Sequence, residues 1–235
     1  TGSFNVAMGY QSLYSNTASN NTAIGYQCLR SNTTGINNVA IGNQCGKFCN
    51  EDFLTNGEGG DPETRTPKNN VLMGDECAKG ASDSNGHRFS GAQNVFIGHK
   101  CALAAKSISN CVAIGTEALK SATRFSSSNN VAIGRFAGKS IVSNSSNQQP
   151  TGEGSGNTII GAFAGENLTS GKNNVIIGFR VGTSANTSDT ELRIGSLILV
   201  CGFSAVSLTE FALFVLTLSL TLSANFFIKV RSILS

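Results

Sequence analysis

Apolar residues recur along the chain in groups of three, each preceded by a polar residue and followed by glycine, as in Asn38-Val39-Ala40-Ile41-Gly42. This five-residue pattern occurs ten times before residue 196. Its first column is Asn in eight of ten copies, and its fourth column is always Ile or Met. Its last column is invariant, and we predict these glycines to be the structural positions of a repeat: Gly9, Gly25, Gly42, Gly74, Gly98, Gly115, Gly134, Gly161, Gly178 and Gly195.

The spacing of these glycines predicts a stack of similar coils. Successive steps are 16, 17, 32, 24, 17, 19, 27, 17 and 17 residues, which is one basic step of 16 or 17 with insertions in four of them. Self-similarity at a short fixed period is typical of a solenoid, in which each repeat contacts only its neighbours. We therefore expect an all-β repeat domain over residues 1–195 and a separate hydrophobic segment over 196–235.

Each copy has the alternation of a β-strand, with the second and fourth columns on one face and the third column on the other. Both faces are apolar, which predicts a second buried surface beyond the interior of one coil. We expect the third column to form the outward stripe: Ala7, Ala23, Ala40, Ala113 and Ala132. A second short strand is predicted after the glycine, as in Tyr26-Gln27-Cys28-Leu29, with a return turn at Ser31-Asn32-Thr33-Thr34-Gly35.

The repeat resembles the head repeats of trimeric autotransporter adhesins, the YadA-like family, and related repeats of viral and phage tail fibres. The residues that carry the resemblance are the runs Asn37–Gly42 and Asn129–Gly134, the small column after the glycine and the Ser-Asn-Thr-Thr-Gly turn. The resemblance covers residues 1 to about 195 and implies a left-handed parallel β-roll that assembles as a homotrimer. This chain differs from that family in its slightly longer coil, its large insertions and its many cysteines.

The cysteines follow the repeat. Three residues after the glycine stand small, mostly apolar residues, among them Cys28, Cys45, Cys77 and Cys101, in the same column as Ala118. A buried free cysteine behaves as a small hydrophobic residue, so we expect these thiols to be reduced and buried rather than disulfide-bonded or bound to zinc. The Asn column has a structural interpretation too, because identical amides stacked coil upon coil form a hydrogen-bonded ladder.

No catalytic or metal-binding pattern emerges, and we predict a protein that is not an enzyme and has no cofactor. His87 and His99 have no nucleophile or ligand at informative spacing. The insertion between Gly42 and Gly74 carries five acidic residues, which suits either a calcium loop or a solvated surface excursion; the ligand spacing of known calcium loops is absent, so we favour the excursion. The formal net charge of +3 is too small and too scattered along the chain to predict a nucleic-acid partner.

The last forty residues change in character. From Phe211 to Ile228 the chain is uncharged, with Lys229 and Arg231 following, which suits a membrane-spanning helix over about 207–228. Leucines at 216, 218, 220 and 222 alternate with Ser and Thr, which is strand periodicity. A third interpretation is a reading frame that runs into sequence never selected to be protein.

These patterns predict a fibrous protein on an extracellular surface, either a virion fibre or the bacterial cell surface, that acts by multivalent attachment. The expected partners are two further copies of the chain and a host-surface receptor, a matrix protein or a glycan. The alternatives are a structural spacer without a ligand, and the fibre region of a larger protein with an enzymatic or chaperone domain elsewhere. Thr1 lies inside a repeat, so we expect the chain to be a fragment.

Overall fold

The fold is a single parallel sheet of ten short strands, one for each copy of the repeat. The computed structural model describes residues 2–49, 66–80, 89–106, 108–122, 128–141 and 154–195. The strands are β1 (Val6–Met8), β2 (Thr22–Ile24), β3 (Val39–Ile41), β4 (Val71–Met73), β5 (Val95–Ile97), β6 (Val112–Ile114), β7 (Val131–Ile133), β8 (Thr158–Ile160), β9 (Val175–Ile177) and β10 (Leu192–Ile194).

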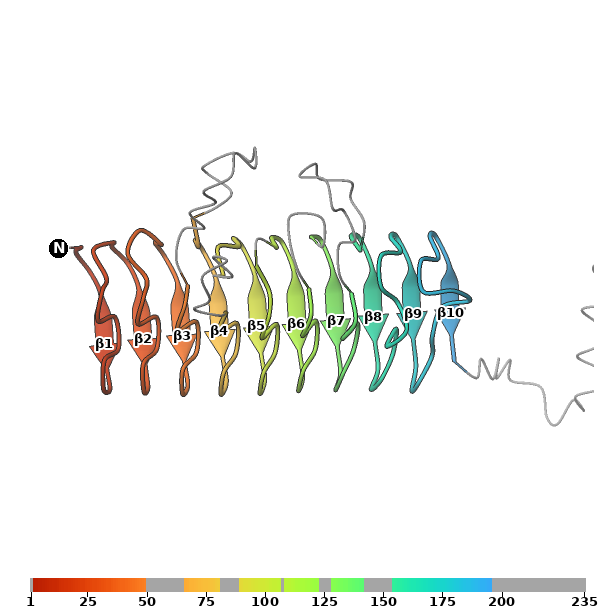
Figure 1. The fold of residues 1–235 in the computed structure, drawn as a ribbon, viewed down its shortest axis with the longest axis horizontal. Coiled ribbons are helices and arrows are strands. Elements are labelled where there is room, and N and C mark those ends of the chain that lie inside the picture. The colour runs from red at the N-terminus through yellow and green to blue at the C-terminus, as the bar shows by residue number, and fades with distance from the viewer. Residues whose placement is uncertain are drawn as a thin grey trace, which may run out of the picture. The chain divides into compact units, whose positions relative to one another are not determined.

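The strands pair in chain order from β1 to β10, and every pairing is parallel (Figure 1). The register matches the repeat column for column: Ala23 pairs with Ala7 on one side and with Ala40 on the other. The described residues contain no helix. The predicted all-β stack of parallel coils is confirmed.

The third column of the repeat faces the inside of the coils, so the predicted outward Ala stripe is wrong. Ala23, Ala40, Ala113 and Ala132 have no exposed surface, and Ala7 is exposed because it lies on the edge strand β1. The flanking Val and Ile columns face outward instead. The physical reason is space: the narrow interior of a 16- to 17-residue coil admits one inward side chain per three-residue strand, and that position is often alanine.

The predicted second strand is also wrong. After the repeat glycine the backbone alternates between right- and left-handed conformations, with φ of 52° at Gln27 and 46° at Leu29. This segment still bonds to both neighbouring coils: Gln27 N–H donates to Tyr10 O (2.8 Å), and Leu29 N–H donates to Cys45 O (3.0 Å). The hydrogen bonds between coils therefore continue around a tight turn. The alternation of side chains along this segment had predicted a strand.

In most coils a large interior side chain faces a small one in the adjacent coil, and Ala102 with Ala113 is an exception. The residue four positions after the repeat glycine is Leu, Ala or Gly, and it abuts the inward strand residue of the next coil. A Cβ added to Gly46 would lie 3.1 Å from Leu72, and one added to Gly138 would lie 3.0 Å from Ile159. Where the column holds a leucine, as at Leu119, the next strand carries Ala132 in the inward position.

Several predicted features lie outside the described residues. They include the acidic insertion, His87, the seventh cysteine and the whole segment 196–235, with all three of its interpretations. Among the residues that the structure does describe, no helix is both long enough and apolar enough to cross a membrane.

Candidate functional site

The repeat glycines form one edge of the strands, where each coil touches the next backbone to backbone. In nine of the ten, all but Gly195, φ runs from 120° at Gly9 to 139° at Gly42, a region that other residues rarely adopt. A Cβ on Gly115 would lie 2.6 Å from Gly134 O, and one on Gly42 would lie 2.3 Å from Gly74 O. Glycine is thus required by both conformation and stacking distance. At these positions the backbones of adjacent coils lie too close together to admit a side chain.

The Asn column forms the predicted amide ladder, buried inside the stack. Asn70 donates its backbone N–H and its side-chain Nδ2–H to Asn38 Oδ1, at 3.1 and 2.9 Å. Its second Nδ2–H donates to Gly91 O at 2.8 Å, which fastens the loop that enters the next coil. The same pattern recurs where Asn94 donates to Asn70 and where Asn174 donates to Asn157. Each amide therefore joins three consecutive coils.

Cys111 takes the place of asparagine in the sixth rung of this ladder. Its backbone N–H still donates to Asn94 Oδ1 at 3.0 Å, and Asn130 N–H approaches its Sγ at 3.5 Å. A sulfur atom is a weak acceptor and offers no amide donors. The ladder is therefore weakest at this rung.

The residue before each ladder position was not singled out from the sequence. It adopts a left-handed conformation in every coil, for example Asn37 with φ of 58° and Asn129 with φ of 58°. Asparagine tolerates this region better than most residues. The Asn-Asn pair in several copies could have revealed this position in the sequence. The first Asn of the pair suits the left-handed conformation, and the second forms the ladder.

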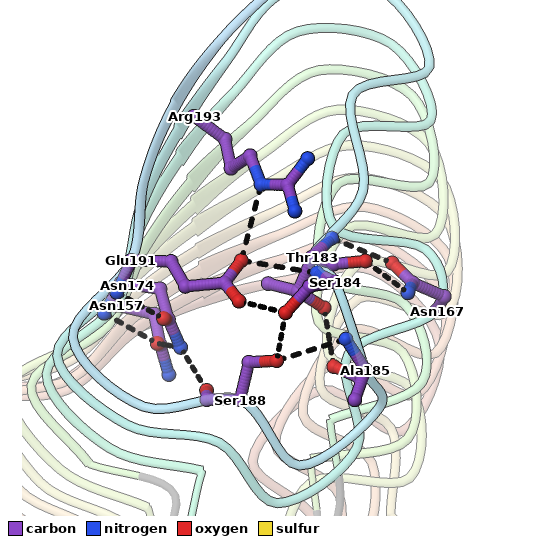
Figure 2. Close-up of polar contacts among 9 residues, drawn as sticks. All are labelled: Asn157, Asn167, Asn174, Thr183, Ser184, Ala185, Ser188, Glu191 and Arg193. Atoms are coloured by element: carbon purple, nitrogen blue, oxygen red, sulfur yellow. Dashed lines mark hydrogen bonds and ion pairs between the residues drawn. The ribbon is translucent and has the colours of Figure 1, made fainter.

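The ladder ends at Glu191, which takes the Asn position in the last coil (Figure 2). Its backbone N–H donates to Asn174 Oδ1 at 2.8 Å, and its carboxylate accepts from the Ser184 hydroxyl, from Ser184 N–H (3.0 Å) and from Arg193 Nε (3.2 Å). The hydrogen bonds from Ser184 lower the pKa of Glu191 to about 2. Arg193 is exposed in the inward column of this last described coil, between the exposed Leu192 and Ile194.

The six described cysteines are free and buried, and burial was predicted for the four in the small column, Cys28, Cys45, Cys77 and Cys101. Three thiols of the small column donate to backbone carbonyls of the next coil: Cys28 to Gly42 O at 3.1 Å, Cys77 to Phe96 O at 3.3 Å and Cys101 to Ala113 O at 3.2 Å. Ser12 makes the same contact to Ala23 O at 2.8 Å, which explains why serine shares this column. Burial raises the pKa of Cys111 to about 11, so its thiol is protonated at neutral pH.

The outward face of the sheet is apolar and runs along all ten strands. Its flanking columns are only partly covered: Met73, Ile114 and Ile160 are each 36% exposed. The Ile/Met column lies in register across every strand pair, as the alignment of Ile114 with Ile133 shows. The members of this outer apolar stripe are Met8, Ile24, Ile41, Met73, Ile97, Ile114, Ile133, Ile160, Ile177 and Ile194.

A second column on the surface is cationic, and the sequence reasoning missed it. The fifth residue after the repeat glycine is basic in five coils, and we call this set the basic stripe: Arg30, Lys47, Lys79, Lys120 and Lys139. Inter-coil bonds hold these positions in line, because Ser31 N–H donates to Lys47 O (3.0 Å) and Phe48 N–H donates to Lys79 O (2.9 Å). Charges that are scattered along the chain are thus aligned in space. Comparing the charge at each position of the repeat across the ten copies would have revealed this stripe.

Near the C-terminal end of the sheet, aromatic rings and guanidinium groups stack in alternation. The Arg135 guanidinium lies 4.6 Å from the ring centre of Phe136 and 5.4 Å from that of Phe163. Arg180 lies 5.3 Å from the rings of both Phe163 and Phe179. A hollow beside these groups is lined by Phe163, Glu166, Asn167, Arg180 and Gly182.

Of the two histidines, only His99 lies in the described part of the chain. Its Nε2 lies 3.4 Å from Asp75 Oδ2, and Asp75 also accepts from Asn43 Nδ2 at 2.7 Å. These three side chains stand on adjacent coils, one residue after the repeat glycine. Within the described ranges, no group of three or more His, Cys, Asp or Glu residues is arranged to hold a metal ion.

Comparisons with known proteins give no relative. No family model, no curated protein and no solved structure matches the chain. Function must therefore be argued from the surfaces of the stack.

Proposed function

We propose that this chain is the left-handed β-roll of a homotrimeric fibrous surface protein that acts by multivalent attachment. The observation that supports the proposal is the outer apolar stripe, which continues over ten in-register strands. A long apolar surface that is exposed to solvent is typical of a protein interface. Three copies that pack these sheets around a common axis would cover it.

The stack also suits attachment. Each coil repeats the same surface at the inter-strand spacing of about 4.8 Å, and a trimer presents three such arrays at once. Weak contacts made many times along a rigid body add through avidity. A host-surface glycan, a receptor or a matrix protein would be held in this way.

The assembly is tested by sedimentation equilibrium of the full chain at micromolar concentration. We expect a mass of three chains for the native protein and of one chain for Ile114→Lys, because three unpaired ammonium groups would be buried near the axis. Thr187→Lys is the matched control, since Thr187 is exposed in a turn away from the strands. A native protein that stays monomeric would refute the trimer.

Attachment is tested by immobilising matrix proteins and glycans and measuring retention of the native trimer and of Ile114→Lys. We expect the trimer to be retained much longer than the monomeric variant, because dissociation then requires several contacts to break together. Absence of retention on every surface would favour a structural spacer.

A further inference from the structure

Three of the five cations of the basic stripe make no ion pair with a described residue. Within the described ranges, the only ion pairs on the stripe join Lys79 to Glu76 and Lys120 to Glu117. Arg30 donates to Gln11 Oε1 at 3.0 Å and Lys47 to Gln44 Oε1 at 3.4 Å, and both acceptors are neutral. Burial, then the like charges of Lys79 and Arg30, lower the pKa of Lys47. The coils thus hold like charges side by side.

Aromatic rings lie beside these cations at several coils. Arg30 lies 5.6 Å from the ring centre of Tyr14, Lys47 lies 5.1 Å from that of Phe48, and Lys139 lies 4.7 Å from that of Phe136. Contact with a ring face restrains a long cationic side chain and keeps its charge available. The Arg135 and Arg180 guanidinium groups extend the cationic surface by the same means at the C-terminal coils.

We infer that the basic stripe binds an acidic polysaccharide, a linear chain of sugars that carries sulfate or carboxylate groups at regular intervals. The cations stand in adjacent coils in two runs, Arg30 to Lys79 and Lys120 to Lys139, and the coil of Leu103 separates the runs. Within each run the cations repeat at about 4.8 Å, close to the rise of one sugar in an extended chain. Arg30, the one guanidinium of the stripe, suits bidentate binding of sulfate or carboxylate, and the four lysines attract the same groups as point charges. The inference rests on the proposed attachment function and names its ligand class.

The ring contacts favour a sugar chain over a nucleic acid. Binding of single strands needs ring faces free for the bases to stack on, whereas Arg135 and Arg180 both lie within 5.4 Å of the ring centre of Phe163. A lipid surface requires no fixed charge spacing. The fixed spacing of the cations within each run of the stripe therefore favours a chain that carries its charges at regular intervals.

The test measures binding of heparin, polygalacturonate and neutral dextran to the full chain by surface plasmon resonance at physiological ionic strength. We expect the two acidic polymers to bind and dextran not to bind. Lys47→Gln with Lys139→Gln should weaken heparin binding about tenfold or more, since each cation near an anionic surface contributes about 1 kcal/mol.

The matched control is Lys68→Gln with Lys172→Gln, which removes the same charge from one column on a different corner, two residues before the Asn ladder. We expect this variant to bind heparin within about twofold of the native chain. Equal loss in both variants would overturn the inference, because it would show binding governed by net charge alone. Tighter binding to duplex DNA or to phosphatidylserine vesicles than to heparin would overturn it too.

The outcome is separable from that of the proposed assembly. Sedimentation of the same samples reports the trimer independently of the ligand. A trimer that binds neither acidic polymer would refute only the inferred ligand. A monomer that binds them through the stripe would refute only the proposed trimer.

Discussion

The repeat glycine shows how one missing side chain fixes the geometry of a coil. At Gly115 the backbone has φ of 133°, and the carbonyl of Gly134 on the next coil lies where a Cβ would stand. A larger residue must therefore change either its own conformation or the separation of two coils. The invariance of this column within the chain follows from both constraints together.

Gly115→Ala should lower the free energy of unfolding by more than about 3 kcal/mol, because backbone strain and steric overlap add. Thr116→Ala, one residue later on the surface, should change it by less than about 0.5 kcal/mol. Urea denaturation followed by circular dichroism measures both. Similar stability for the two variants would show that the coils can separate at little cost.

Cys111→Asn should stabilise the protein by about 1 kcal/mol, because an amide at the sixth rung restores the hydrogen bonds that sulfur cannot make. The control is Cys49→Asn, which buries the same new amide outside the ladder and should destabilise the protein, since its polar atoms lack that partner set. Thermal unfolding of both variants provides the comparison. A loss of stability in Cys111→Asn would contradict the ladder as the reason for asparagine in this column.

At the scale of the coil, the interior depends on pairs of residues in neighbouring repeats. Gly138 leaves room for Ile159, whereas Leu119 faces a coil whose inward strand residue is Ala132. Leu119 also holds a left-handed conformation, with φ of 48°, that a leucine adopts only under the constraint of its surroundings. Side-chain volume is thus balanced between coils and not within each strand alone.

Ala132→Ile should destabilise the stack by about 1–3 kcal/mol through overpacking. Adding Leu119→Gly to it copies the Gly138 and Ile159 arrangement, so the double variant should be more stable than the sum of the two single changes predicts. A double-mutant cycle from urea denaturation measures this coupling. Additive effects would mean that the two positions do not share space.

The C-terminal coil should respond to acid through Glu191. Its folded pKa of about 2 lies below the ordinary value of 4.5, so its contribution to stability is present above pH 4.5 and is lost as the pH falls toward 2. Carboxyl-carbon NMR should show this titration, and Ser184→Ala should move the pKa of Glu191 back toward 4.5 because the strongest hydrogen bond is removed. An unchanged midpoint in that variant would contradict the assignment.

The sequence predicted the strands, their parallel register, the glycine edge, the Asn ladder and the buried thiols, because all of these follow from columns of one repeated pattern. It failed on which strand face is inward, since Val39, Ala40 and Ile41 are all apolar and alternation alone cannot choose between faces. It failed on the second strand at Gln27 and Leu29 because alternating left-handed residues also bond between coils. The basic stripe was missed because charge was counted along the chain instead of by column.

At the scale of the whole repeat domain, stability is a sum over coils and their shared interfaces, since each coil contacts only its neighbours. Such a stack opens from its ends, where a coil has one neighbour instead of two. At the first coil, Met8 and Tyr10 are more than half exposed. At the other end, the polar contacts of Glu191 close the last described coil. Leu192 in the last described coil is 70% exposed as well, so we expect both ends to open before the middle of the stack. Opening from the N-terminal end reaches Cys28 before the other described cysteines.

Thiol labelling reports this order, because the described cysteines lie at successive depths in the stack and are all buried. In native protein without reductant we expect no alkylation at short times; in moderate urea, Cys28 should react first, Cys45 next, and Cys101 and Cys111 last. Mass spectrometry of peptides after a short alkylation pulse measures each site. Simultaneous labelling of every site would indicate that the stack unfolds as one cooperative unit. A disulfide between Cys28 and Cys45 in the native protein would contradict the prediction that these thiols are reduced and buried.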